Sequence, residues 1–455
     1  MDIIICGAGR VGFNLARYLS RHNHEITMID SSLQLISSLN DRLEVKALCG
    51  HASSPEVLRK AGIETADMVI AVTRSDEVNM VICEVAHALF GVKTKIARIR
   101  HHDFLDPRWV SLFHPHHLSI DFIISPEIEV AQAISTSLQI PGALEIISLS
   151  ENKIKVLTIR CVKETPVINT PISHFTTLFP DLEISVVGMM RGDTQWIPDE
   201  KDIFLEGDKL YFACAAPHVS YAMMAFGHEG ESSGNILILG GGNIGLKLAQ
   251  EIEASSFRRR AVVIEKDSER AAEVAEILSD TIVLCGDALD KEVLLEAGVQ
   301  SAHTVVAVTA DDRVNALSAL LAKRQGAKHV SSLINSGSFE SLVSSLGVDA
   351  VINPRKVTVS KILQYINREK FHSVYSLGSQ FGELMEIDTM EASAFVGLSA
   401  QDVNVSKSVR LVAILRDGGV YMEKRSLTIA HGDRLLLMVA PAAQSRIEKM
   451  LTSWA

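Results

Sequence analysis

Short apolar runs alternate with helical patterns over the first 125 residues, and the same order returns in the second half of the chain. Continuous apolar runs are typical of parallel strands buried on both faces, and a single apolar stripe is typical of the crossover helices between them. The expected strands of the first half are residues 3–6, 26–29, 45–48, 68–72, 95–99 and 120–124. The second half repeats the order across residues 235–353. We therefore predict two tandem α/β folds of the Rossmann-like, doubly wound type.

Each predicted fold is followed by an amphipathic helix and then by strands of a different kind. The helices are expected over residues 127–138 and 355–366, each after a proline. Beyond them the apolar residues alternate with period two, which indicates a small α+β domain. Its strands are expected at residues 155–160, 184–188 and 209–213, and in the second half at 383–388, 410–415 and 434–439.

The repeat predicts four domains in two pairs. A chain of 455 residues is long enough to give each of them a core. A polar stretch at residues 228–234 is the expected linker between the halves. The predicted domains are residues 1–125, 140–228, 234–354 and 370–455.

A glycine-rich turn follows the first strand of each predicted fold. The first turn consists of Gly7, Ala8, Gly9, Arg10, Val11 and Gly12, and the second of Gly240, Gly241, Gly242, Asn243, Ile244 and Gly245. In a doubly wound sheet this turn presents backbone N–H groups and the positive end of a helix to a pyrophosphate. One such motif is weak evidence, because it matches many unrelated turns. Two in matching contexts indicate a duplicated nucleotide fold.

An acidic residue ends the second strand of each fold, Asp30 in the first and Glu265 in the second. A carboxylate at this place accepts hydrogen bonds from both ribose hydroxyls and repels a 2′-phosphate. The sequence therefore favours NAD(H) or an adenine nucleotide over NADP(H). The alternative at each site is a decayed turn that only packs a helix on a strand.

Further candidate binding residues recur in the same order in both halves. They are Gly50, His51, Ala52, Thr73, Arg74, Asp76, Asn79 and Arg98 in the first half, and Gly286, Asp287, Ala288, Thr309, Asp312 and Asn315 in the second. Arg10 stands opposite Asn243, so only the first turn is expected to have a cation beside the phosphates. Arg98 stands opposite Leu333. We expect additional phosphates to favour the first site, unless these arginines are only solvated surface residues.

The amino-acid composition of the chain limits the classes of partner that it is expected to bind. A formal charge of −11 disfavours binding to nucleic acid or anionic lipid, since both need basic surfaces. The longest uncharged stretch, residues 210–227, is interpreted as a strand and a short apolar helix, not a membrane span. Because the N-terminus runs directly into a core strand, we expect no signal peptide and a cytoplasmic protein.

Neither catalytic nor metal-binding chemistry is predicted. The small domains carry no His/Asp or Tyr/Lys constellation, and no Gly-x-Ser-x-Gly motif occurs in the chain. Histidines cluster in one expected exposed loop without nearby cysteines, and no spacing among them is diagnostic of zinc, so we expect them to be surface residues. They are His101, His102, His114, His116 and His117.

The ordered double set of motifs resembles the family of Trk potassium uptake A subunits, the peripheral subunits of bacterial Trk systems, which carry two tandem RCK units. The resemblance spans nearly all of the chain. It rests on the turns, Asp30, Thr73-x-x-Asp76-x-x-Asn79, Arg98 and Ser125-Pro126, with a second set from Gly240 to Pro354. It implies that the large domains bind NAD(H) and ATP or ADP, and that the small domains are of the RCK C-terminal type.

The resemblance also implies partners and a place of action. Nucleotide state would gate a Trk-type membrane potassium channel or transporter, with the chain peripheral on the cytoplasmic face of the inner membrane. RCK units pair through the helices expected at residues 127–138 and 355–366, and four chains would form a ring of eight units. His51 departs from the acid that the second half keeps as Asp287, which puts that acid's role in doubt in the first half. A soluble NAD-dependent enzyme with a degenerate second half is the alternative.

Overall fold

A computed structural model of the chain forms two compact units. The first unit comprises Met1–Glu129 and Pro354–Tyr365, and the second comprises Val130–Asn353 and Ile366–Ala455. The structure describes residues 1–21, 24–114, 116–140, 142–163, 165–179, 182–192, 194–228, 234–255, 260–367, 373–378, 381–389, 395–403, 408–422, 427–443 and 447. Most of the predicted linker, residues 229–233, lies outside these residues.

The first unit is built on a parallel sheet with the strand order β3-β2-β1-β4-β5-β6. Its strands are β1 (Asp2–Cys6), β2 (Glu25–Asp30), β3 (Lys46–Cys49), β4 (Met68–Ala71), β5 (Thr94–Arg98) and β6 (Phe122–Ile124). The central strands β1 and β4 are buried almost throughout, as their continuous apolar sequences predict. Strand order reverses between β1 and β4, and ligands of open α/β sheets bind at the carboxyl ends of the strands at such a point.

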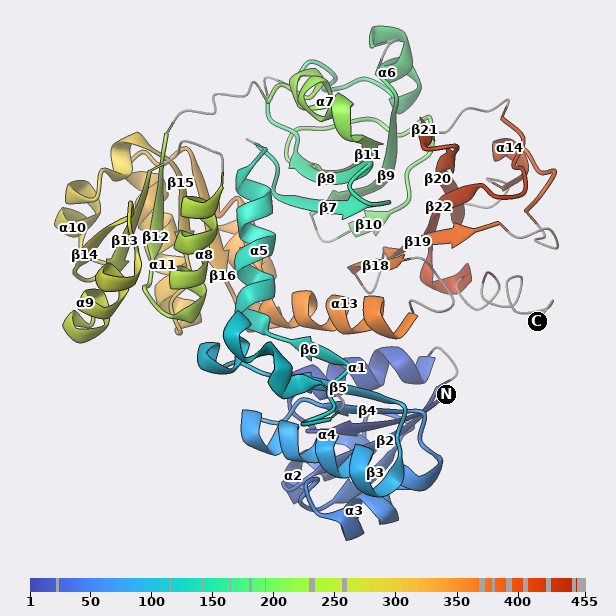
Figure 1. Cartoon of the computed structure of the whole chain (residues 1–455). Coiled ribbons are helices and arrows are strands. Elements are labelled where there is room, and N and C mark those ends of the chain that lie inside the picture. The colour runs from blue at the N-terminus through green and yellow to red at the C-terminus, as the bar shows by residue number, and fades with distance from the viewer. Residues whose placement is uncertain are drawn as a thin grey trace. The chain divides into compact units, whose positions relative to one another are not determined.

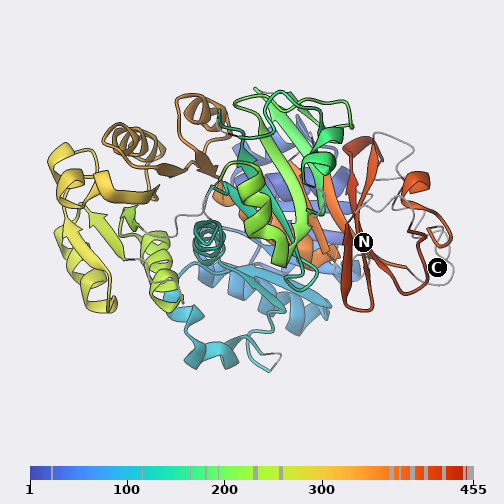
Figure 2. The ribbon, with the colours of Figure 1, turned by 90° about the horizontal axis from the view of Figure 1, so that it is seen from above.

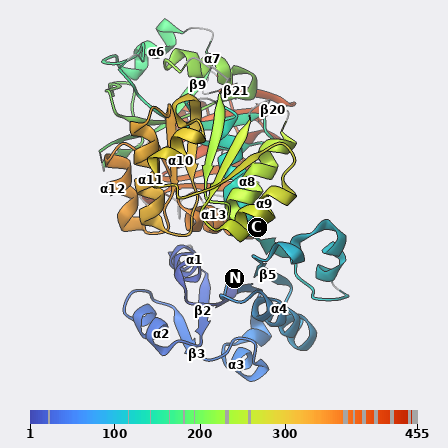
Figure 3. The same cartoon turned by 90° about the vertical axis from the view of Figure 1, so that its left-hand side faces the viewer.

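Helices cover both faces of this sheet (Figure 1). They are α1 (Arg10–Arg21), α2 (Leu33–Asn40), α3 (Pro55–Lys60), α4 (Asp76–Phe90) and the first turn of α5 (Pro126–Leu138). Figure 3 shows α1 and α2 on one face and α4 on the other. The hydroxyl of Ser32 caps α2 and that of Ser75 caps α4, while Gly91 ends α4 in the left-handed conformation.

Part of α13 (Pro354–Asn367), the helix after the second parallel sheet, also belongs to the first unit. The ring of Tyr365 stacks on Phe122 of β6, with ring centroids 4.4 Å apart. The ammonium group of Lys361 lies 3.2 Å from the carboxylate of Glu129 in α5. The two helices expected to pair therefore touch within one chain, and pairing between chains stays a prediction.

The second unit contains another parallel sheet with the matching order β14-β13-β12-β15-β16-β17. Its strands are β12 (Asn235–Leu239), β13 (Ala261–Glu265), β14 (Ile282–Cys285), β15 (Ala302–Ala307), β16 (His329–Leu333) and β17 (Ala350–Ile352). Its helices are α8 (Asn243–Ala254), α9 (Ser268–Ile277), α10 (Lys291–Glu296), α11 (Asp312–Arg324) and α12 (Gly337–Ser345). Figure 3 shows α8 and α9 on one face of this sheet and α10 and α11 on the other.

Two antiparallel sheets complete the second unit, with orders β10-β9-β11-β8-β7 and β18-β19-β22-β20-β21. The first has β7 (Glu145–Leu149), β8 (Ile154–Arg160), β9 (Ile184–Arg191), β10 (Thr194–Trp196) and β11 (Lys209–Ala215), with helices α6 (Ile172–Leu178) and α7 (Val219–Ala225). The second has β18 (Ser373–Gly378), β19 (Gly382–Asp388), β20 (Val409–Arg416), β21 (Gly419–Met422) and β22 (Arg434–Val439), with helix α14 (Ala400–Val403). When the second order is read from its other end, it becomes β21-β20-β22-β19-β18 and matches the first order strand by strand. The two sheets therefore have the same topology.

The small sheets share one apolar cluster, and they lie side by side in Figures 1 and 2. Equivalent positions of both sheets enter this cluster, namely Val156 and Leu384, Val187 and Val412, Tyr211 and Leu436, and Ala213 and Met438. The ring of Phe381 lies against Gly188, where an added methyl group would come within 2.6 Å of it. Each small sheet thus uses the equivalent face to pack against the other, as two subunits do in a symmetric dimer.

Each small sheet also contains the same buried ion pair. The guanidinium group of Arg191 donates two hydrogen bonds of 2.8 Å to the carboxylate of Asp208. Arg416 donates two of 2.7 Å to Asp433. Both carboxylates are almost fully buried, and each also accepts the backbone N–H of the residue three positions before it along the chain. These bidentate pairs fix the Gly-Asp turn that precedes the last strand.

The predicted fold class is confirmed. The strands β7, β10, β18 and β21 were not predicted, and the expected strand at residues 120–124 is shortened to β6. The uncharged stretch at residues 210–227 forms β11 and α7, as expected. No helix in the described part of the chain has the length and apolar character needed to span a bilayer.

Candidate functional site

The first glycine-rich turn joins β1 to α1 at the carboxyl edge of the sheet. Gly7 has a φ of +113°, a conformation that L side chains rarely adopt. A methyl group on Gly12 would overlap the carbonyl oxygen of Gly7. Gly9 differs from both, since no atom lies within 4 Å of the position its Cβ would take. The turn is therefore closed by Gly7 and Gly12 and open at Gly9, where a ligand can approach the backbone.

The second turn, between β12 and α8, repeats this geometry. Gly240 has a φ of +111°, and a methyl group on Gly245 would overlap its carbonyl oxygen. Gly242 is open in the same sense as Gly9. It precedes α8 with no side chain bound to the free N–H groups of the helix. Both turns thus present unobstructed backbone donors and the positive end of a 12-residue helix.

The two acidic residues reach back to the turns. One carboxylate oxygen of Asp30 accepts the N–H of Ala8 at 2.6 Å, and the other accepts the N–H of Ser32 at 2.8 Å. In the second site Glu265 accepts the N–H of Gly241 at 2.6 Å. The structure therefore places each acid beside its turn, where a ribose attached to a turn-bound phosphate would lie.

Small turns at the ends of β3 and β14 border these acids. The backbone N–H of Gly50 donates to the carbonyl oxygen of Asp30, and that of Gly286 donates to Glu265, both at 2.9 Å. The residues that follow are the exposed His51 in the first site and Asp287 in the second. Ala52 and Ala288, which come next in these turns, are buried, as are Ala8 and Val11 of the first glycine-rich turn.

The Thr–Asn pairs shape the loops after β4 and β15. The buried amide of Asn79 accepts the backbone N–H and the hydroxyl of Thr73, and donates to the carbonyl oxygen of Arg98 at 2.8 Å. Asn315 makes the same bonds to Thr309 and donates to the carbonyl oxygen of Leu333 at 2.9 Å. These amides clamp neighbouring strand ends, and their contact with a nucleotide stays a prediction.

Asp76 and Asp312 hold the next loops in an equivalent way. Asp76 accepts the backbone N–H groups of Arg100 and His101, both at 2.8 Å. Asp312 accepts those of Asn335 and Ser336, both at 2.9 Å. These bonds also fix the correspondence between the sites. Arg100 is the counterpart of Asn335, just as Arg98 is the counterpart of Leu333.

Two arginines at the end of β5 distinguish the first site. Arg98 donates to the carbonyl oxygen of Thr73 at 2.7 Å, while its buried Nε has no partner in the described chain. Burial, followed by the charge of Arg100, lowers the pKa of Arg98. Arg100 pairs with Glu127 of α5 at 3.0 Å. The first site therefore holds a partly satisfied guanidinium group that the second site lacks.

The second site has cations of its own, which sequence comparison missed. Arg270 in α9 donates to the carbonyl oxygen of Gly241 at 3.0 Å, directly beside the turn. Lys266 pairs with Asp287 at 2.8 Å. The expectation that only the first turn has a cation beside it is wrong. The glycine-rich motif gave no sign of this cation, because the position opposite Arg10 is Asn243 and Arg270 comes from α9, a later helix.

The histidine-rich segment contacts the first site through the backbone N–H of His101, which Asp76 accepts. The ring of His101 lies 3.6 Å from the carboxylate of Asp103. His117 lines a pocket of about 420 Å³ with Phe104 and the exposed Trp109. Among the residues that the structure describes, no three His, Cys, Asp or Glu side chains are grouped as metal ligands.

Comparison with known families agrees with the duplicated fold. The TrkA-N domain model matches residues 3–126 and again 236–354, and the TrkA-C domain model matches residues 384–452. The Trk system potassium uptake protein TrkA of Azorhizobium caulinodans is 40% identical over 450 residues, 99% of this chain and 98% of that protein. The protein of the same name from Vibrio alginolyticus is 33% identical and covers 96% of each chain.

Solved structures share the fold at low sequence identity. "GsuK channel bound to NAD" has a TM-score of 0.60 at 17% identity, covering 99% of this chain and 79% of that chain. "Crystal structure of the GsuK bound to ADP" has a TM-score of 0.50 at 14% identity, covering 81% and 69%. These structural likenesses show the fold alone. The full-length relatives and both family domains show the family: the chain belongs to the family of Trk system potassium uptake protein TrkA.

Proposed function

We propose that the chain is the cytoplasmic, nucleotide-sensing subunit of a Trk-type potassium uptake system. The observation that carries this proposal is the pair of glycine-rich turns, each closed by two glycines, open at Gly9 or Gly242, and bordered by an acid. Each turn supplies backbone donors for a pyrophosphate, and the acid supplies an acceptor for the ribose. Membership of a family named for potassium uptake supports the transport role.

The nucleotides that fit best are NAD(H) and ATP or ADP. Asp30 and Glu265 favour a free 2′-hydroxyl group, because a 2′-phosphate would be repelled by the carboxylate. Distant neighbours of the same fold carry NAD and ADP in their names, which supports the same class of ligand.

The two sites are proposed to prefer different nucleotides. In the first site, Arg98 and Arg100 lie at the end of β5, across the strand-order reversal from the turn, so a longer phosphate chain would gain charge-assisted hydrogen bonds there. In the second site, Lys266 and Arg270 lie on the side of the acid and the turn. We assign ATP or ADP preferentially to the first site and leave NAD(H) to either.

Regulation needs no catalytic step. A ligand shifts a gate only through different affinities for two conformations, and about 1–3 kcal/mol of coupling gives several-fold regulation. In the first unit a route for that coupling runs from Arg98 through Arg100 and its pair with Glu127 into α5, and onward from Glu129 to Lys361 in α13. Ligand contact at Arg98 would therefore bias the helix pair through which RCK units assemble.

The proposed partners follow from this role. Four chains would form a ring of eight RCK units beneath a Trk-type membrane potassium channel or transporter. The chain would be held at the cytoplasmic face of the inner membrane by that partner alone. The negative net charge of the chain agrees with a protein partner better than with nucleic acid or lipid.

Potassium or rubidium uptake in cells that lack the chain tests this proposal. Wild type is expected to restore uptake, and the double variant Gly9→Asp with Gly242→Asp is expected not to, because each added Cβ has open space and the carboxylate it carries would repel the phosphate. Gly337→Asp is the matched control, since this exposed glycine at the start of α12 is equally unobstructed. Full restoration by the folded double variant would overturn the proposal.

A further inference from the structure

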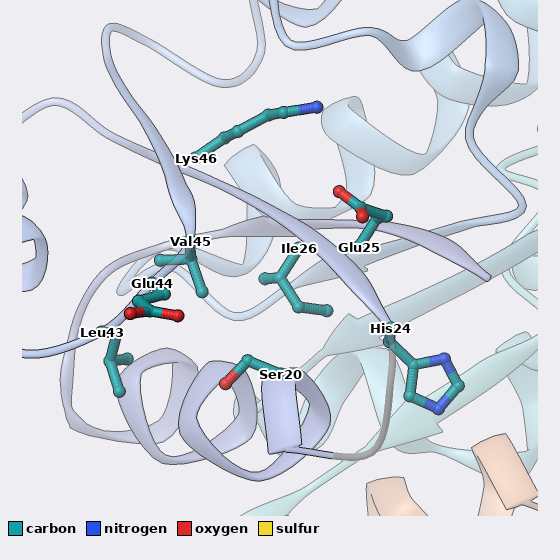
Figure 4. Close-up of a pocket in the computed structure, with 8 residues that line it drawn as sticks. All are labelled: Ser20, His24, Glu25, Ile26, Leu43, Glu44, Val45 and Lys46. Carbon is teal, nitrogen blue, oxygen red and sulfur yellow. The ribbon is translucent and has the colours of Figure 1, made fainter.

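A pocket of about 680 Å³ opens at the amino edge of the first sheet, the edge opposite the glycine-rich turn (Figure 4). It lies where α1 ends and where β2 and β3 begin. Its lining residues are Ser20, His24, Glu25, Ile26, Leu43, Glu44, Val45 and Lys46. None of them belongs to the nucleotide site, so the pocket calls for an explanation of its own.

The second fold shows what occupies the corresponding place there. Helices α1 and α8 have the same length and bury equivalent positions, so Ser20 of α1 corresponds to Glu253 of α8. Strands β3 and β14 correspond as well, so the loop at Leu43 to Val45 corresponds to the loop at Ser279 to Thr281.

In the second fold the Glu253 carboxylate fills this loop. It accepts the backbone N–H groups of Ser279 at 3.1 Å, Asp280 at 2.9 Å and Thr281 at 2.9 Å. Burial by itself would raise the pKa of Glu253, but the hydrogen bonds from Asp280, Thr281 and Ser279 outweigh burial and lower that pKa. Successive N–H groups that converge in this way form a backbone nest for an anion.

In the first fold the same loop has no carboxylate from its own helix. Ser20 is too short to reach it, and its hydroxyl donates instead to the carbonyl oxygen of Arg17. Leu43 donates its N–H to the carbonyl oxygen of Leu39, but the N–H groups of Glu44 and Val45 have no acceptor in the described chain. Two of the three nest donors are therefore open to the pocket.

The charges at the pocket restrict what fits. Lys46 and His24 also line the pocket and are its basic side chains, and Figure 4 shows the Lys46 side chain extending away from Ser20 and Glu44. Glu25 and Glu44 line the same pocket, and they would repel a dianionic phosphate more strongly than a singly charged group. A group with one negative charge and two acceptor oxygens meets both conditions.

We propose that this pocket is a binding site for a carboxylate group, which takes the place that Glu253 occupies in the second fold. The carboxylate comes either from a small organic acid or from an Asp or Glu side chain of a second copy of the chain. The proposal is independent of nucleotide binding, because the pocket and the turns lie at opposite edges of the sheet.

Hydrogen exchange measured by mass spectrometry on the full chain tests it. Sodium acetate is the probe, with sodium chloride at equal ionic strength as the reference. Acetate is expected to slow exchange several-fold in peptides covering residues 43–46, because the amides of Glu44 and Val45 gain an acceptor. Peptides covering residues 279–282 serve as the internal control and should not respond, since Glu253 already protects them.

Two variants sharpen the result. Ser20→Glu restores the carboxylate, so residues 43–46 should be protected without acetate and should no longer respond to it. Ser20→Ala should keep the acetate response of wild type. Protection of wild type that falls on dilution, without acetate, would identify a second copy as the source of the carboxylate. Two results would overturn the proposal. The first is that wild type shows no acetate effect at any protein concentration and also no loss of protection on dilution. The second is an acetate effect on Ser20→Glu equal to that on wild type.

Discussion

The two nucleotide folds agree in their backbone and differ in the side chains around it. Both keep a first glycine with positive φ, a last glycine with no room for a methyl group, and an Asn that clamps two strand ends. Around this common frame, the first fold gathers Arg98 and Arg100 at the ends of its strands, and the second gathers Lys266 and Arg270 beside its turn. The duplicated folds therefore share the backbone of the turn and differ in the charges around it, and the proposed difference in nucleotide preference rests on those charges.

The two small domains also share a common frame and differ in particular side chains. Their strand orders, their apolar faces and their Arg–Asp pairs are equivalent. They differ where they touch each other, since Phe381 of the second lies against Gly188 of the first. Shared features thus mark what the fold requires, and differences mark what each copy does separately.

The largest effect is expected at the glycines that both turns need. Gly12→Ala and Gly245→Ala each drive a methyl group into the carbonyl oxygen of the turn's first glycine, so the helix must shift. We expect each to lower the free energy of unfolding by about 3 kcal/mol or more in urea unfolding of the full chain. Gly9→Ala and Gly242→Ala are the controls, and a comparable loss in these open positions would contradict the geometry.

A smaller loss is expected from the ion pairs of the small domains. Asp208→Ala and Asp433→Ala each remove two hydrogen bonds from an arginine and one from the backbone. We expect about 2–3 kcal/mol for either variant, and nearly equal losses, in the same urea experiment. Arg108→Ala removes an ion pair on the surface while Asp106 keeps its backbone hydrogen bond, and it should leave unfolding nearly unchanged. Unequal losses would show that the two small domains are not energetically equivalent.

The difference in charge between the sites gives the next prediction. Arg98→Leu installs the second fold's residue in the first fold, and it should weaken ATP binding at that site roughly tenfold because a charge-assisted contact is lost. Binding at the second site should not change. Calorimetric titration of the full chain measures both. Arg17→Leu, on the exposed side of α1, is the control, and an equal loss there would show that only long-range charge matters.

The smallest effect is a dependence on pH in the second small domain. Burial alone would raise the pKa of Asp433, but the hydrogen bonds from Arg416 and from the backbone of Ala430 lower it below the ordinary value of 3.8. A carboxyl group whose folded pKa is lowered contributes stability above its unfolded pKa and loses it as pH falls. The urea midpoint of wild type should therefore fall between pH 5 and pH 3. Asp433→Asn should show a smaller fall over this interval, and an identical fall would exclude this carboxylate as the cause.

Much of the fold could be predicted because its signals are local. Parallel strands buried on both faces give continuous apolar runs, and the glycine turns and acids lie at fixed positions after them. The strands β7, β10, β18 and β21 are the edge strands of the two small sheets, where pairing with one neighbour, more than a strong local pattern, determines the strand.

The candidate site was predictable only in part, because some of its contacts depend on packing between segments that are distant along the chain. The turns and acids meet as the motif requires, but the contact of Arg270 with Gly241 depends on how α9 packs beside α8. The open nest at Glu44 and Val45 became visible only when Ser20 was compared with Glu253 in the second fold. Such relations join segments that are distant along the chain, and sequence spacing does not encode them.

Binding of nucleotide to the two turns is the central claim, and calorimetric titration of the full chain with ATP and with NADH tests it most directly. The account predicts that Gly9→Asp abolishes binding at the first site, that Gly242→Asp abolishes binding at the second, and that Gly337→Asp leaves both intact. Unchanged binding of both nucleotides in the folded double variant would contradict the account.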